Sequence, residues 1–254
     1  MSTKAPLMLL HGVTMSASAW DDVAPLLADD FDLIVPTAVG HRGGPPRSGH
    51  TTIERLVDVT EQLLDERGLS SVHVAGNSLG GWMAIELARR GRARSVCALS
   101  PAGFWTPGTH DNTGATNVLI RTKRLAELSR VLAPIVTWPA FARKLMLRDI
   151  AVHGDRLSQS QTLAIVQDVV ECSAAADLLG TTESVARMDI LPCPITLVWA
   201  EKDRLFPPSV NGVIAQQRIP GAQYVVLPGV GHVPMIDDPA RCAEVIRSTV
   251  DMAA

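Results

Sequence analysis

The 254-residue sequence lacks the features that mark several large classes of protein. Its four cysteines form no C-x-x-C pair and no dense cluster, so neither a zinc site nor a disulfide framework is indicated. No apolar run reaches the ~18–20 residues that cross a bilayer, and the apolar start of the chain is too short for a secretory signal. A net charge of −3 argues against a nucleic-acid partner. We therefore expect a cytoplasmic protein with no membrane span.

The sequence contains enough apolar residues for a large core. It also shows a regular alternation of predicted strands and helices. Hydrophobic residues make up 46% of the chain. Short runs typical of buried strands alternate with segments of helical spacing, as in a parallel sheet with helical crossovers. The predicted strands cover residues 6–10, 31–35, 71–75, 95–99, 195–199 and 223–227.

Three helices of this alternating pattern carry start or stop signals. Thr51 and Glu54 have the spacing of a capping box, and the helix that follows ends at Gly68. A second helix covers residues 79–90 and is followed directly by Gly91. Asp237 and Asp238 stand before Pro239 and are expected to start the last helix, which continues to about residue 250.

The pattern changes between residues 104 and 188, where no strand-like run occurs. Apolar residues there fall at helical spacing, an interruption comes at Trp138, and a long helical stretch is expected over residues 158–179. We expect a helical cap at 104–188, inserted into a core made of residues 1–103 and 189–254.

The strongest chemical signal is the segment Gly76-Asn77-Ser78-Leu79-Gly80, which matches G-x-S-x-G between a strand and a helix. Such a sharp turn forces the serine into a strained conformation and exposes its hydroxyl at the edge of the sheet. The flanking glycines are required because a β-carbon there would collide with the adjoining strand or helix. The turn also directs the Leu79 amide and the positive helix terminus at the same point.

A serine nucleophile needs a base and an acid that orients the base. Asp203 and His232 each follow a predicted strand, so both are expected at the same sheet edge as Ser78. Glu201, two positions before Asp203, is a rival for the acid.

These residues resemble the α/β-hydrolase fold superfamily, whose members have the order Ser, Asp, His along the chain. The resemblance implies catalytic roles for Ser78, Asp203 and His232, and it favours Asp203 over Glu201 as the acid. Leu9-Leu10-His11-Gly12-Val13 is similar to the family's His-Gly loop. It implies that the amides of Val13 and Leu79 form the oxyanion hole, that His11 braces the loop, and that neither metal nor organic cofactor is needed.

Two features near the start of the chain depart from the family pattern or could be mistaken for another site, and they refine the predicted fold. Only five residues precede the apolar residues of the first strand, too few for the β-hairpin common in the family, so we expect about six mostly parallel strands with helices on both faces. The strand at 31–35 then lies at an edge, to be covered by a loop or by a second copy in a homodimer. The Gly-rich stretch 40–44 is expected to form a tight turn rather than a phosphate site.

The residues at two positions separate the reactions known in this superfamily. Val233 replaces the Lys that the hydroxynitrile lyases of this fold need after the catalytic His. Haloalkane dehalogenases and epoxide hydrolases of this fold use an Asp where Ser78 stands. The pattern therefore favours a serine hydrolase acting on a small or medium-sized carboxylic ester. The alternatives are a carbon–carbon bond hydrolase, a thioesterase, or a ligand receptor of slow turnover. The carbon–carbon bond hydrolases of this fold have the same serine-containing turn, with a further glycine at the position of Gly81.

The predicted cap has two further features. Trp105 and Trp138 are candidates for the lining of the acyl pocket. Seven basic residues and one acid lie between Arg121 and Arg148, whereas six acids and one base lie between Asp149 and Glu183. This uneven charge indicates either two solvated faces that attract each other or an entrance for anionic substrates such as coenzyme A thioesters.

Overall fold

The computed structural model describes residues 4–106, 108, 114–129 and 131–253. Within these ranges six strands form one sheet in the order β2-β1-β3-β4-β5-β6, and every neighbouring pair is parallel. The α/β fold with six strands is confirmed, with all of the strands parallel. The strands are β1 (Ala5–Leu10), β2 (Phe31–Ile34), β3 (Val72–Asn77), β4 (Ala93–Leu99), β5 (Ile195–Ala200) and β6 (Gln223–Leu227).

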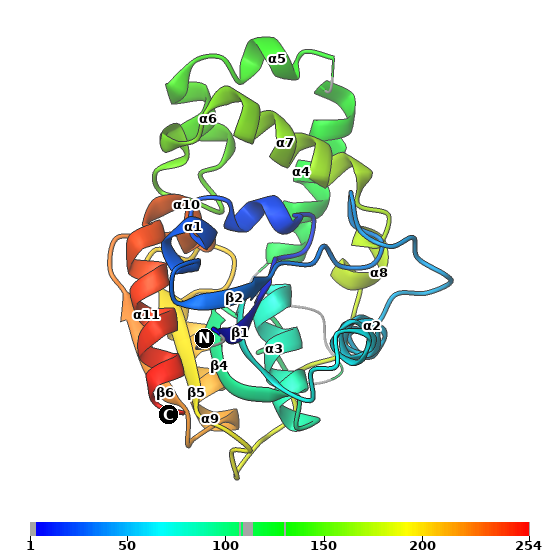
Figure 1. Ribbon diagram of the computed structural model, residues 1–254. Helices are drawn as coiled ribbons and strands as arrows, with labels where there is room; N and C mark the ends of the chain where they lie inside the picture. Colours follow the sequence, from blue (N-terminus) through cyan, green and yellow to red (C-terminus); the bar gives the residue numbers. More distant parts are fainter. Residues whose placement is uncertain (1–3, 107, 109–113, 130, 254) are drawn as a thin grey trace.

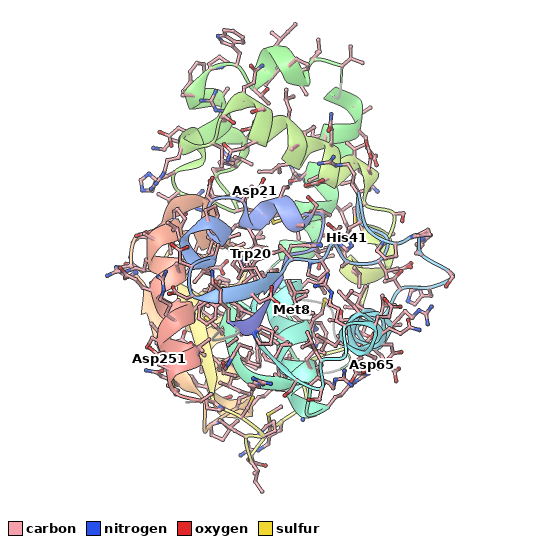
Figure 2. All side chains as sticks on the ribbon, in the orientation of Figure 1. Met8, Trp20, Asp21, His41, Asp65 and Asp251 are labelled. Atoms are coloured by element: carbon pink, nitrogen blue, oxygen red, sulfur yellow. The ribbon has the colours of Figure 1, made fainter. Side chains whose placement is uncertain are left out.

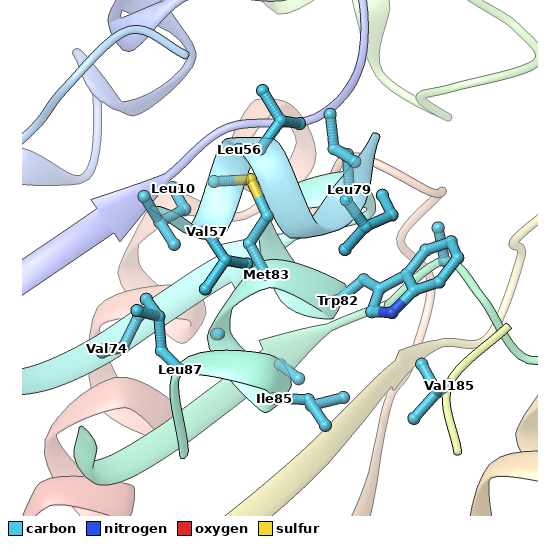
Figure 3. Close-up of a cluster of buried hydrophobic side chains, with 14 of the residues drawn as sticks. Leu10, Leu56, Val57, Val74, Leu79, Trp82, Met83, Ile85, Leu87 and Val185 are labelled. Atoms are coloured by element: carbon cyan, nitrogen blue, oxygen red, sulfur yellow. The ribbon is translucent and has the colours of Figure 1, made fainter. Parts of the chain in front are cut away.

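Helices cover both faces of the sheet. Successive strand residues point to opposite faces, so both faces carry apolar side chains that have to be buried. In β1, Met8 and Leu10 belong to one buried cluster, whereas Leu7 and Leu9 belong to the other. Figure 1 shows α2 and α3 on one side of the sheet and α11 on the other, and Figure 3 shows α3 packing in the first cluster through Met83 and Leu87. The core helices are α1 (Ala24–Leu27), α2 (Ile53–Glu66), α3 (Leu79–Arg89), α9 (Val213–Arg218), α10 (Pro234–Asp237) and α11 (Pro239–Asp251), with short helices η1 (Ala17–Trp20) and η3 (Pro208–Gly212).

The start of α2 differs from the prediction by one residue. Thr52, not Thr51, is the N-cap, and its side-chain oxygen accepts a hydrogen bond of 3.1 Å from the Arg55 amide. Thr51 is buried, and its own amide donates to Asp177. The capping box expected between Thr51 and Glu54 is therefore wrong, because Thr51 is held by a contact with a distant part of the chain.

The segment between β4 and β5 contains only helices and loops among its described residues. These are α4 (Ala115–Ser129), α5 (Ala133–Val136), α6 (Ala140–Met146), η2 (Gly154–Arg156), α7 (Gln159–Glu171) and α8 (Ala175–Leu179). In Figure 1 α4, α5, α6 and α7 lie above the sheet, and α8 lies near α2.

The helical stretch predicted over 158–179 consists of two helices, α7 and α8, with a break at residues 172–174. The amides of Ser173 and Ala174 both donate to the carbonyl of Gly40, at 2.8 and 3.2 Å, instead of continuing a helical ladder. Gly40 has a φ of +74°, and a β-carbon there would lie 2.7 Å from the Ala174 β-carbon. The expected turn at 40–44 is therefore also an attachment point for the helical segment. His41, labelled in Figure 2, lies beside this junction.

A buried carboxylate makes a second attachment between α7 and the core. Asp168 accepts hydrogen bonds from Arg42 Nε at 2.6 Å and from Ser16 Oγ at 2.8 Å. Burial raises the pKa of Asp168, and these two donors oppose that rise. Residues far apart in sequence thus hold the helices over the carboxyl ends of the strands.

β2 lies at an edge of the sheet, as predicted for the strand at 31–35. Its apolar residues Phe31 and Ile34 are buried, whereas Asp32 faces solvent. Coverage of this edge by a second copy of the chain stays a prediction. None of the described helices has the length and apolar character needed to span a membrane.

Candidate active site

Ser78 lies in the sharp turn between β3 and α3. Its φ of +55° and ψ of −113° fall in a region that costs a non-glycine residue about 1–3 kcal/mol. A β-carbon on Gly76 would lie 2.1 Å from the Gly80 carbonyl oxygen, and one on Gly80 would lie 2.2 Å from the Leu10 oxygen. Both contacts are with backbone, which cannot move away, so glycine is required on each side of the serine.

Asp203 and His232 form a buried pair at the ends of β5 and β6. His232 Nδ1 and Asp203 Oδ2 are 2.8 Å apart. The other oxygen of Asp203 accepts from the amides of Leu205 and Phe206, at 3.0 and 2.8 Å. The carboxylate is thus held by three donors, and it keeps Nδ1 of the ring occupied, so that Nε2 points away from Asp203.

The rival acid Glu201 is exposed and takes part in a different contact. Its carboxylate accepts a hydrogen bond of 2.8 Å from the Gly229 amide, and this contact lowers the pKa of Glu201. The ring of His232 therefore contacts Asp203 and not Glu201.

Ser78 and His232 line one cavity beneath the helical segment. Its walls also include Gly12 and Val13 from the loop after β1, and Val118 and Met146 from α4 and α6. No hydrogen bond joins the Ser78 hydroxyl to the imidazole within the described structure. Catalytic hydrogen bonds of this kind are often long or misaligned in the absence of a substrate.

The two backbone amides predicted to hold an oxyanion lie beside Ser78. Leu79 is the first residue of α3, where an N–H has no partner within the helix. Val13 lines the cavity of Ser78 and also an adjoining one, which is lined by Leu79, Trp105 and Phe206.

The two tryptophans predicted for the acyl pocket have different environments. Trp105 is buried and lines the adjoining cavity. The expectation for Trp138 is wrong, since its side chain is 74% exposed and lies outside both cavities. The turn between α5 and α6 directs it to solvent.

Two residues that the sequence analysis did not place at the site hold the backbone around His232. Asn77 Nδ2 donates to the His232 carbonyl at 2.9 Å. Asp237 is buried and accepts hydrogen bonds from the amides of Gly231, Val152 and His153 at 2.7, 3.0 and 2.6 Å. The expectation that Asp237 helps to start the last helix is therefore wrong. Asp238 alone caps α11, through a bond from the Arg241 amide.

His11 connects two loops and stays neutral. Its Nε2 accepts from the Ala38 amide at 2.9 Å, so the proton is on Nδ1, which donates to the Gly12 carbonyl at 2.8 Å. Burial, together with the neighbouring His41, lowers the pKa of His11 from 6.5 to about 3. With both nitrogens in use, His11 braces the loop that carries Val13.

The described residues contain no group of three His, Cys, Asp or Glu side chains placed to hold a metal ion. The groups that the structure places at the site are the Ser78 hydroxyl, the imidazole of His232 paired with a carboxylate, and backbone amides.

The chain belongs to the alpha/beta hydrolase family, whose sequence model matches residues 7–245. It is 34% identical over 200 residues to Epoxide hydrolase EphH of Mycobacterium tuberculosis, covering 77% of this chain and 94% of that protein. It is 27% identical over 247 residues to Lipase 3 of Moraxella sp., covering 92% of this chain and 74% of that protein.

Among solved structures, a thermophilic esterase from Thermogutta terrifontis superposes with a TM-score of 0.74 and 24% identity, covering 99% of this chain and 91% of the other. At this identity the likeness shows the fold alone. The family membership makes the protein an α/β hydrolase, and the named relatives act on different kinds of bond.

Proposed function

We propose that the protein is a serine hydrolase of carboxylic esters that works through an acyl-enzyme. In this proposal Ser78 is the nucleophile, His232 the general base and acid, and Asp203 the residue that fixes the imidazole. The core would comprise residues 1–103 and 189–254, with residues 104–188 as the cap. The partner is a small-molecule ester.

The observation that carries the proposal is the 2.8 Å contact between His232 Nδ1 and the buried Asp203, together with the cavity that His232 shares with Ser78. A carboxylate on Nδ1 selects the tautomer whose Nε2 can accept a proton, and it stabilises the imidazolium that results. His232 is the one histidine among the described residues that line this cavity.

The reaction would proceed in two halves. Ser78 Oγ attacks the ester carbonyl while His232 Nε2 takes its proton, and the oxyanion that forms accepts hydrogen bonds from the amides of Val13 and Leu79. Each such donor lowers the barrier by about 3 kcal/mol. His232 then returns the proton to the departing alcohol. Water, deprotonated by His232, cleaves the acyl-enzyme and regenerates Ser78.

Ser78 distinguishes the proposed ester hydrolysis from epoxide hydrolysis, the activity for which one relative is named. Epoxide hydrolases of this fold have a carboxylate in the turn after the third strand, whereas this chain has the hydroxyl of Ser78 there. Carbon–carbon bond hydrolysis, thioester hydrolysis and slow-turnover ligand binding use the same three residues, so the choice of substrate decides among them.

The test is a substrate screen on the wild-type protein and on Ser78→Ala. p-Nitrophenyl esters and acyl thioesters of increasing chain length would be compared with styrene oxide and a vinylogous 1,5-diketone. We expect ester hydrolysis that falls by at least ~10³-fold in Ser78→Ala with an unchanged circular dichroism spectrum. Ester hydrolysis that persists in Ser78→Ala, or turnover of the epoxide alone, would overturn the proposal.

A further inference from the structure

The segment from Leu125 to Met146, here called the cap apex, contains most of the exposed large hydrophobic residues of the described chain. Sixteen large hydrophobic residues of the described chain are exposed, and ten of them lie in this segment. They include Leu128 and Val131, at 85% and 87% exposure. Scattered exposed hydrophobic residues need no explanation, but a concentration of this kind marks an interaction surface. The ten are Leu125, Leu128, Val131, Leu132, Ile135, Val136, Trp138, Phe141, Leu145 and Met146.

Buried small residues hold the cap apex with these side chains outward. Ala133 and Thr137 are its buried members around α5, and Thr137 Oγ1 donates to the Ala133 carbonyl at 2.7 Å. Arg143 donates to the carbonyls of Thr137 and Trp138, which ties the turn after α5 to α6. In Figure 1 α5 lies at the end of the molecule farthest from β5 and β6. The part of the cap apex around α5 therefore lies far from β5 and β6.

The cap apex is bordered by positive charge. Seven basic residues and one acid lie between Arg121 and Arg148. Arg121 and Arg124 are exposed and have no ion pair within the described part of the chain. Lys144 and Arg148 meet acids only at 3.8 and 3.9 Å, on the surface, where pairing is weak.

We propose that the cap apex docks on the surface of an anionic lipid bilayer. Exposed aromatic and aliphatic side chains bordered by Lys and Arg are the combination by which a protein lies in the interface of a negatively charged membrane. A second copy of the chain fits less well, because a symmetric contact would set one cationic border against the other.

The surface is continuous with the cavity described above. Met146 belongs to the exposed set and also lines the cavity that contains Ser78 and His232. Docking would thus bring the wall of that cavity to the lipid surface. The docking itself is independent of the proposed ester hydrolysis and is tested without it.

The fluorescence of Trp138 can report binding to vesicles, because the other four tryptophans are at most 6% exposed. Wild-type protein would be mixed with vesicles of phosphatidylglycerol or of phosphatidylcholine, and binding followed by co-sedimentation and by tryptophan fluorescence. We expect binding and a blue shift with phosphatidylglycerol, weakening as salt is raised, and neither with phosphatidylcholine.

Two double variants test the two parts of the surface. Leu128→Ser with Phe141→Ser, and Arg121→Glu with Arg124→Glu, are each expected to lower the partition coefficient on the order of tenfold or more. Ile190→Ser is the apolar control, an 88% exposed residue away from the cap apex. Arg67→Glu with Arg241→Glu is the charge control. Both controls are expected to bind as the wild type does.

The proposal would be overturned if the protein did not bind phosphatidylglycerol vesicles at low salt, or if it bound both lipids equally. It would also be overturned if the cap-apex variants bound as the wild type does while keeping its thermal transition. A blue shift that depends on protein concentration without vesicles, with a dimer in sedimentation, would instead assign the cap apex to a second copy.

Discussion

The buried carboxylate of Asp237 accepts a hydrogen bond of 2.7 Å from the amide of Gly231, the residue directly before His232. The same carboxylate accepts from Val152 and His153, which follow α6. On the other side of the histidine, the Val233 amide donates to the Ile150 carbonyl at 2.8 Å. The position of the imidazole therefore depends on the segment that covers the cavity.

Asp237→Asn tests this dependence. An amide in place of the carboxylate keeps the size but turns a hydrogen-bond donor toward backbone N–H groups, which leaves at least one of them unpaired. We expect the free energy of unfolding to fall by about 1–3 kcal/mol and kcat for ester hydrolysis to fall about tenfold or more.

Asp238→Asn is the matched control, because asparagine caps a helix as well as aspartate does. It should change neither quantity appreciably. If Asp237→Asn lowered the stability but left kcat and its pH profile unchanged, Asp237 would have only a structural role.

Asp203→Asn should reduce kcat by on the order of 10³–10⁴-fold, because an amide no longer selects the reactive tautomer of His232 or stabilises the imidazolium. Glu201→Gln, two residues away and exposed, should keep kcat within about twofold of the wild type. Steady-state kinetics on a p-nitrophenyl ester measure both. Equal losses in the two variants would contradict the assignment of the acid.

Gly80→Ala is expected to destabilise the fold by about 3 kcal/mol or more, or to prevent folding, because the new methyl group would lie 2.2 Å from the Leu10 carbonyl oxygen. Gly221→Ala is the control, with only the flexible Leu191 side chain 3.3 Å away. Urea denaturation compares the two. Similar free energies of unfolding for both variants would show that the turn can relax around Gly80.

The buried His11 predicts how stability depends on pH. Its pKa is lowered to about 3, mainly by burial, whereas the unfolded chain takes up the proton near 6.5. The contribution is therefore fully present above pH 6.5 and is lost as the pH falls toward 3, by up to about 1.4 kcal/mol per pH unit. Burial lowers the pKa of His41 in the same direction.

His11→Gln should make the plot of unfolding free energy against pH less steep between pH 6 and pH 4. The substitution also removes hydrogen bonds, but that loss shifts the whole curve and leaves the slope as the readout. Urea denaturation at several pH values gives the slope, and a slope equal to that of the wild type would contradict a neutral His11.

The strands and the order of the site residues could be predicted from the sequence because their signals are local. The strands around Met8 and Val198 are apolar runs, and Ser78 stands in a turn whose glycines have no substitute. The carboxyl ends of parallel strands meet at one edge, so the proximity of Asp203 and His232 followed from position alone.

The features that were missed depend on contacts between distant segments. Nothing local distinguishes Asp237 from Asp238, since both precede Pro239, and only the approach of residues 152–153 buries the first of them. The break in the helix at Ser173 comes from the Gly40 carbonyl, more than a hundred residues earlier. Trp138 is apolar and lies in the cap, but its direction is set by the turn after α5.

The reactivity of the hydroxyl at the turn between β3 and α3 is the most direct test of the account. Wild-type protein would be incubated with a fluorophosphonate probe, digested, and sequenced by mass spectrometry. We expect stoichiometric labelling on Ser78, strongly reduced in His232→Ala. Absence of label on Ser78, or labelling of equal rate in His232→Ala, would contradict a serine activated by that imidazole.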